Sequence, residues 1–237
     1  MRLRTLTYLI FAVATAGAAW ADDLADFNAA VEAASAHNRV AIEYLRNGNA
    51  DLAALELDRM REAWTKIGER KRPAVFAGDP LYTTVMTDIA TRLVTADLML
   101  NLGRPENARQ ALLGIRKDLH DLRKSAHIVV LADCVRDANE AMDKLMTYDA
   151  RPQDFGRREF DAGLAESAQT YAAILSRCDG IASEATRKDP EFRRLVDGAA
   201  ASLAKVPTAI AEKDADLLHR LLGELRSFDN LLAFRYG

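Results

Sequence analysis

The chain has 237 residues, of which 28% are charged and only 7% are aromatic, and it contains 12 glycines and 6 prolines. Its net charge is -3 at pH 7, and a mildly acidic protein is a poor candidate for binding nucleic acid or anionic lipid. Alanine, leucine and charged residues dominate while β-branched runs are nearly absent, so the composition favours helix almost everywhere.

The first 21 residues have the pattern of a secretory signal peptide. Arg2 and Arg4 precede an apolar run over residues 6–18, and Ala19-Trp20-Ala21 places small residues directly before Asp22. The run is too short to favour a permanent membrane span, although left uncleaved it would anchor the protein. No later segment approaches the apolar length of a span. We therefore expect export to the periplasm or secretion, with no stable membrane span after cleavage.

Apolar residues then recur at steps of three and four, which places them on one face of a helix. This spacing predicts about eight amphipathic helices, so the expected fold class is all-α. The apolar stripes that define them cover residues 24–47, 50–70, 82–100, 108–122, 128–145, 164–178, 192–210 and 218–232. Pro207 should kink or end the seventh helix near its last turn.

The breaks between these helices are short and contain residues that suit helix ends. Gly48 and Gly103 can adopt positive φ, and Pro105 suits a first helical turn. Asp79 and Asp189 each precede a proline and are expected N-caps. Short connections imply antiparallel neighbouring helices. A longer polar stretch over residues 148–158 separates the fifth helix from the sixth.

Comparison of the chain with itself predicts an internal duplication of a four-helix unit. The Asp-Pro caps lie 110 residues apart, and the same shift pairs apolar positions of the third, fourth, seventh and eighth helices, as well as Asp51 with Asp161. Upstream of residue 148 the shift falls to 100, which an insertion near 148–158 explains. The predicted halves are residues 22–130 and 131–237, arranged either as tandem bundles or as one helical array.

Two cysteines follow the leader, Cys134 on the fifth predicted helix and Cys178 on the sixth. An even count and an oxidising compartment favour a disulfide. The two positions lie at similar distances from the intervening loop, with a mismatch of about 6 Å along the helix axes. The pair is therefore interpreted as a structural staple, with two buried free thiols as the alternative.

No catalytic motif stands out, so no catalytic residue is assigned and the chain is expected not to be an enzyme. His37, His120 and His127 could approach one another in the first half, where three imidazoles would hold a metal. No histidine pair has the spacing of a metal-binding motif, so surface or capping histidines are the preferred interpretation. We therefore expect neither a metal nor another cofactor.

Exported four-helix units with this layout resemble the cytochrome c-prime and c556 group. The stretch from Asp216 to Tyr236 is similar in layout to that family's last helix, which carries a Cys-x-x-Cys-His haem attachment site near its end. Here the corresponding segment over residues 228–234 has no cysteine, which excludes covalent haem, and no haem-binding residue carries over. The resemblance thus implies a four-helix bundle without covalently attached haem.

These features together predict a non-enzymatic exported protein that acts as a helical scaffold or binds a protein partner. The alternative is a helical bundle that holds haem, a metal or a small molecule through non-covalent ligands such as His37, His120 or methionines. The second half, which alone carries the cysteines, is the first place to look for function.

Overall fold

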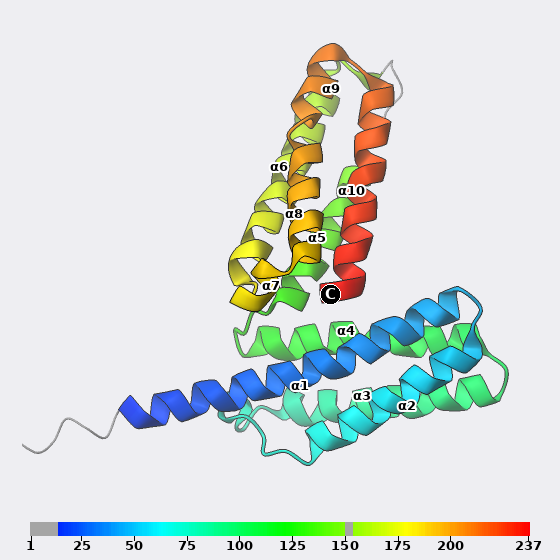
Figure 1. Cartoon of the computed structure of the whole chain (residues 1–237), viewed down its shortest axis with the longest axis vertical. Coiled ribbons are helices and arrows are strands. Elements are labelled where there is room, and N and C mark those ends of the chain that lie inside the picture. Colours follow the sequence, from blue (N-terminus) through cyan, green and yellow to red (C-terminus); the bar gives the residue numbers. More distant parts are fainter. Residues whose placement is uncertain (1–13, 150–153) are drawn as a thin grey trace, which may run out of the picture. The chain divides into compact units, whose positions relative to one another are not determined.

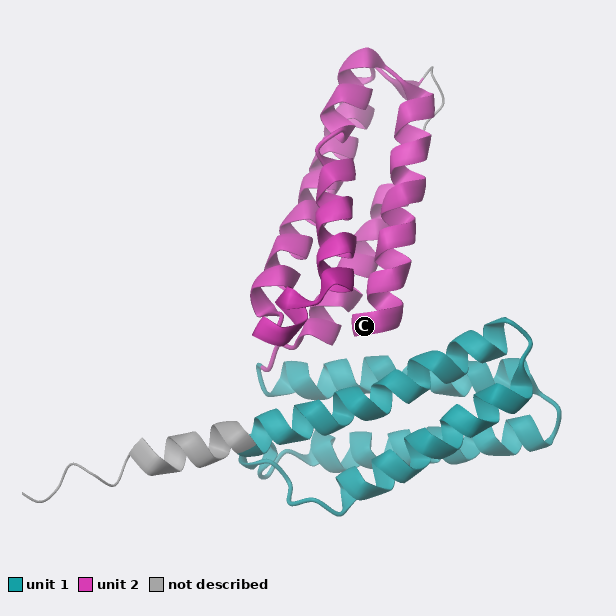
Figure 2. Ribbon diagram, viewed as in Figure 1, with its two compact units in different colours: residues 1–127 teal, residues 128–237 magenta. Residues whose placement is uncertain are grey.

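The structure, a computed structural model, describes residues 14–149 and 154–237, with side chains from residue 23 onward. Helices account for nearly all of this part of the chain and it contains no strand, which confirms the all-α class. Most of the predicted leader lies outside the described residues. The chain divides into two compact units, residues 1–127 and 128–237 (Figure 2). Within the described ranges no helix is long and apolar enough to cross a membrane.

The described part of the first unit, residues 14–127, contains four long helices and one short turn of 3-10 helix (Figure 1). Its elements are α1 (Ala14–Arg46), α2 (Ala50–Gly68), η1 (Ala74–Phe76), α3 (Pro80–Asn101) and α4 (Pro105–Ser125). Each long helix packs against two others, because α1 contacts α2 and α4 while α3 also contacts both α2 and α4. Gly48 and Gly103 have φ values of 76° and 68°, as the turns after α1 and α3 require.

The second unit has the same four-helix plan with one helix broken. Its elements are α5 (Leu131–Met146), α6 (Arg158–Ile181), α7 (Glu184–Lys188), α8 (Pro190–Leu203), α9 (Val206–Glu212) and α10 (Ala215–Tyr236). The predicted seventh helix corresponds to α8 and α9 together, and the break comes just before Pro207, which lies in the first turn of α9. The short α7 was not predicted.

Each unit buries the apolar stripes that the sequence pattern defines. In α3, for example, Tyr82, Val85, Ile89 and Leu93 are each at most 8% exposed. In the second unit the largest fully buried side chains include Tyr171, Phe192 and Met142. Burial of one such side chain contributes about 1.5–3 kcal/mol, so the stripes supply most of the stability of each unit.

The buried positions of the two units coincide at nearly constant sequence shifts. The shift is 100 between α1 and α5, and 110 both between α3 and α8 and between α4 and α10. Between α2 and α6 the buried positions coincide at 111, rather than at the 110 that pairs Asp51 with Asp161. Corresponding buried residues in α2 and α6 are Ala53 and Leu164, Leu57 and Ala168, Met60 and Tyr171, Trp64 and Leu175, and Ile67 and Cys178. Gene duplication stays a hypothesis, but these shifts define which residues occupy equivalent places.

The helices α3 and α8 each begin at an aspartate. This aspartate also accepts a hydrogen bond from a hydroxyl group near the end of the last helix of its unit, α4 or α10. Asp79 accepts a hydrogen bond from the backbone N–H of Leu81 and, at 3.0 Å, from the hydroxyl of Ser125. Asp189 accepts from the N–H of Glu191 and, at 2.8 Å, from the hydroxyl of Tyr236. The Tyr236 hydrogen bond contributes most to lowering the pKa of Asp189. The cap therefore also fastens the ends of two helices together.

Candidate functional site: a groove in the second unit

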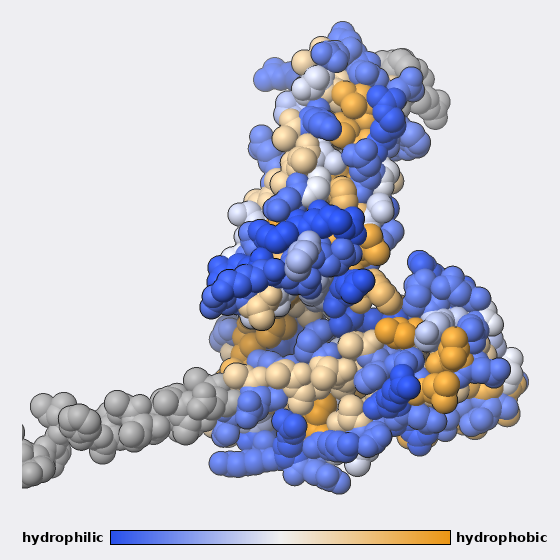
Figure 3. All heavy atoms as spheres, in the orientation of Figure 1, coloured by the Kyte–Doolittle hydropathy of each residue, from blue (hydrophilic) through white to orange (hydrophobic). Residues whose placement is uncertain are grey.

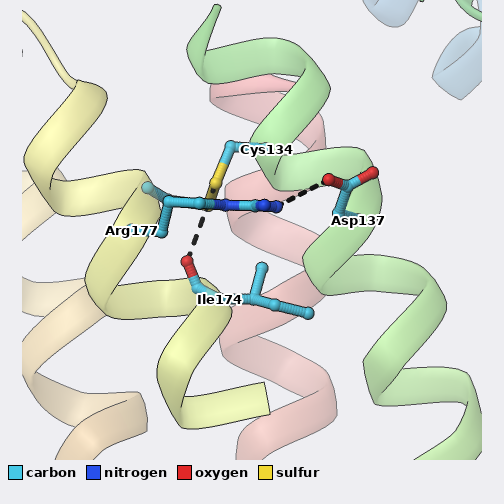
Figure 4. Close-up of a disulfide and its surroundings, with 5 residues drawn as sticks. Cys134, Asp137, Ile174 and Arg177 are labelled. Carbon is cyan, nitrogen blue, oxygen red and sulfur yellow. Dashed lines mark hydrogen bonds and ion pairs between the residues drawn. A yellow bond between two sulfur atoms is a disulfide. The ribbon is translucent and has the colours of Figure 1, made fainter. Parts of the chain in front are cut away.

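The helix α6 is fastened to α5 by the predicted cysteine pair. The sulfur atoms of Cys134 and Cys178 lie at disulfide distance, with their Cα atoms 5.4 Å apart. Both residues are buried, with 0% and 2% exposure. On the surface beside them, Arg177 of α6 donates a hydrogen bond to Asp137 of α5 at 2.6 Å (Figure 4). One disulfide and one ion pair therefore join neighbouring positions of α5 and α6.

The buried carboxyl group of Asp229 links three helices, α5, α6 and α10. Asp229 of α10 is completely buried and accepts hydrogen bonds from the Asn139 amide at 2.6 Å and the Tyr171 hydroxyl at 3.3 Å. Arg226 lies 3.6 Å from the same carboxyl group and 2.7 Å from Asp143 of α5. Burial raises the pKa of Asp229, although the Asn139 amide and the Arg226 charge oppose this effect.

The helix α8, by contrast, lies close to α10. Gly198 has no side chain, and a Cβ atom at this position would lie only 2.6 Å from the ring of Phe228 on α10. The aromatic ring thus occupies the space that a larger residue would need. The helix α6 is thus fastened to α5 and α10, while α8 packs closely against α10.

A groove with a cavity volume of about 790 Å³ runs along this seam between α6 and α8–α9. Its floor is formed by buried apolar residues and its margins by small or polar ones. It is lined by Asp161, Ala165, Ala168, Gln169, Ala172, Leu175, Ser176, Asp179, Val196, Asp197, Ala200, Leu203, Ala204, Val206, Pro207, Ile210 and Ala211. In the space-filling view, residues of moderate to high hydropathy are exposed on this face of the second unit among hydrophilic ones (Figure 3).

The equivalent seam of the first unit is filled by large side chains. Trp64 of α2 is buried and its indole N–H donates to the backbone carbonyl of Met86 on α3 at 3.3 Å. About one turn before Trp64 on α2, Arg61 lies 3.3 Å from Asp97 and links α2 to α3.

The equivalent residues of the second unit are much smaller. Leu175 and Val196 replace Trp64 and Met86, Ala172 and Pro207 replace Arg61 and Asp97, and Ala168 replaces Leu57; all five line the groove. The groove is therefore the consequence of particular small residues at positions where the same plan accommodates large ones.

The predicted histidine candidates do not form a site. His37 Nδ1 lies 2.6 Å from a carboxylate oxygen of Glu56 on α2. His120 is half-buried in α4, and His127 is exposed beyond the end of α4, with φ 55°. In the parts of the chain that the structure describes, no three His, Cys, Asp or Glu side chains are grouped closely enough to hold a metal ion.

Apart from the cysteine pair, sequence reasoning did not assign the residues that build this site. The sequence contained a signal for Asp229. The shift of 110 pairs this acidic residue with Leu119, an apolar residue on a predicted stripe, and Leu119 is buried. The alanines at 165, 168 and 172 form a second signal, since they follow one helical face.

Comparison of the chain with protein-family models, curated proteins and solved structures found no match. The resemblance to the cytochrome c-prime group stays a prediction.

Proposed function

We propose that the protein is an exported, non-enzymatic binding protein whose second unit holds an elongated apolar small molecule in the groove between α6 and α8–α9. The observation that carries this proposal is the groove itself. Its volume of about 790 Å³ falls within the 300–1,000 Å³ that is typical of small-molecule sites. Its walls are mainly alanine, leucine and valine, with a few polar groups at the margins.

The surroundings of the groove support preorganised binding. The Cys134–Cys178 pair and the Asp229 cluster hold α6 from its core side, whereas its groove-lining face carries three alanines, at 165, 168 and 172. A ligand then needs to order little of the protein when it binds, which lowers the cost of association. The leader pattern and the cysteine pair support a location outside the cytoplasm.

The test uses an uncharged apolar dye, N-phenyl-1-naphthylamine, whose fluorescence rises in apolar sites. The full chain should bind it, and Ala172→Trp should abolish binding because the indole fills the groove. The matched control is Ala173→Trp, at the next position of the same helix, which is exposed and does not line the groove. The control should bind the dye as the parent protein does.

Two results would contradict the proposal. One is absence of dye binding by the parent protein, and the other is equal binding by the Ala172→Trp and parent proteins. Circular dichroism of both tryptophan variants verifies that the helices are intact, so that lost binding reports the groove rather than unfolding.

A second candidate function, docking of a protein partner, is favoured by exposed apolar side chains on the first unit. Val94 and Leu98 of α3 and Leu102, the C-cap residue of that helix, are spaced by four residues and are 51–58% exposed, and Leu55 of α2 is 55% exposed. A stripe of this kind is typical of helix docking. Leu98→Glu should abolish capture of such a partner while leaving dye binding unchanged.

A further inference from the structure

The margins of the groove carry charge of one sign. Three of its lining residues, Asp161, Asp179 and Asp197, are acidic. None of the lining residues, all of which belong to the described ranges, is lysine or arginine. Since the floor is apolar, these carboxylates are the only charged groups in the lining that a bound molecule would meet.

The two ends of the groove differ in how many carboxylates they carry, with Asp161 at one end and Asp179 and Asp197 at the other. At the end near the start of α6, Asp161 accepts a hydrogen bond from the Gly156 N–H at 3.1 Å. Lys213 approaches the same glycine, because its ammonium nitrogen would lie 3.1 Å from a Cβ atom at Gly156. At this end Asp161 binds the loop that precedes α6, and Lys213 lies beside the same loop.

At the other end two carboxylates share one guanidinium group. Arg193 binds both oxygens of Asp179, at 2.5 Å and 3.2 Å. Asp197 is only 3.7 Å from the same guanidinium and its side chain is 68% exposed. Because Arg193 is oriented toward Asp179, Asp197 retains most of its capacity to accept hydrogen bonds. One negative charge is left in excess beside the apolar floor.

We infer that the ligand of the groove is an amphipathic organic cation, with its apolar chain along Ala168, Leu175 and Leu203 and its cationic head beside Asp197. This inference rests on the proposed function and adds the sign and position of the ligand's charge. The charge complementarity is local, so it orients the ligand as well as selecting it. The head stays partly in water, and the preference for a cation is therefore modest, about threefold to tenfold in affinity.

The experiment compares three molecules with the same decyl chain as competitors for the bound dye: decyltrimethylammonium, decan-1-ol and decyl sulfate. All are used with the full chain, at low ionic strength and below their micelle concentrations. The cation should displace the dye at about threefold to tenfold lower concentration than the alcohol, and the sulfate should be weakest. Half-molar salt should reduce the difference between cation and sulfate.

The role of Asp197 is tested by Asp197→Asn, which keeps the size of the side chain and removes its charge. This variant should lose about threefold in affinity for the cation and retain its affinity for the alcohol. The control is Asp88→Asn, which removes an exposed carboxylate from α3 of the first unit, a residue that does not line the groove. It should leave all three competitors unchanged.

The outcomes separate the inference from the proposed function. If the alcohol displaces the dye as well as the cation does, or if Asp197→Asn keeps the full preference for the cation, the inference is wrong while the apolar groove stands. If neither the dye nor any decyl compound binds, the proposed function is wrong as well.

Discussion

The hydroxyl of Tyr171 on α6 lies 3.3 Å from a carboxylate oxygen of Asp229 on α10, and both side chains are completely buried. In the first unit Met60 and Leu119 occupy the equivalent places and are also buried. The four-helix plan therefore folds with an apolar pair at this level. The polar pair in the second unit adds a directional contact that sets the position of α6, the helix that forms one wall of the groove.

Removal of the Asp229 carboxyl group should strongly destabilise the second unit. Asp229→Ala leaves the buried Tyr171 hydroxyl without its acceptor, and we expect a loss of about 3 kcal/mol in the free energy of unfolding. The double variant Asp229→Leu with Tyr171→Met copies the first unit and should recover most of that loss. Urea unfolding followed by circular dichroism measures both. If the double variant were less stable than Asp229→Ala, an apolar pair could not replace Tyr171 and Asp229, and the prediction would be wrong.

The same carboxyl group should make stability depend on pH. Because burial raises the pKa of Asp229 above its ordinary 3.8, the folded state binds more protons than the unfolded state at pH values just above 3.8. The contribution of this group to stability is then largest in acid and is lost as pH rises through the folded pKa.

Asp229→Asn cannot ionise and provides the comparison. Its stability relative to the parent protein should increase between pH 4 and pH 7, as measured by urea unfolding at each pH. The neighbouring charges of Arg226 and Asp143 are the same in both proteins, so they largely cancel in the difference. A constant difference across this range would mean that Asp229 does not titrate there.

The cysteine pair should stabilise the second unit through the loop that it closes. The two residues are separated by 44 positions, and a loop of this length contributes about 3–4 kcal/mol through chain entropy. Cys134→Ala with Cys178→Ile, the residues at the equivalent positions of the first unit, should lower the free energy of unfolding by about that amount.

Thiol titration of denatured protein, with and without reductant, gives an independent check of the disulfide. The expected titre is two free thiols only after reduction. Equal titres under the two conditions would show that the cysteines are unpaired, and the stability difference would then report packing alone.

The filled seam of the first unit should become a groove when its large residues are shortened. Trp64→Leu with Arg61→Ala copies Leu175 and Ala172, and the first unit should lose about 2–4 kcal/mol through the cavity that is left. The double variant should also gain a second binding site for the apolar dye. To isolate this site, the measurement is made in the Ala172→Trp background, where the original groove is filled. Unchanged dye binding there would show that side-chain size alone does not create the groove.

The apolar periodicity of the sequence is sufficient to predict the helices and most of their buried faces, because a repeat of three and four residues can be buried on one side only in a helix. Local chemistry likewise predicts the ends. Asp79 and Asp189 cap α3 and α8, and the glycines at 48 and 103 adopt the positive φ values expected of them. Similar spacing from one loop was enough to place Cys134 opposite Cys178.

The rotation of a helix about its axis was harder to infer. Neighbouring residues on a helix differ by about 100°. Steps of three and four along the predicted stripe over 218–232 pass through Phe228, which leaves Asp229 beside the stripe rather than at its centre. In the structure Asp229 is completely buried while Phe228 packs at the edge of the core, next to Gly198. The packing of α5, α6 and α8 around α10 decides this orientation, and those contacts are long-range.

The sequence by itself determined an all-helical chain, the ends of its helices and a cysteine pair on two neighbouring helices, since each of these depends on residues close together in the chain or on a regular repeat. Only the tertiary structure decided that the seam between α6 and α8 stays open. That outcome depends on α6 being held by Cys178 and Tyr171, on α8 packing closely at Gly198, and on side chains too short to fill the space that remains.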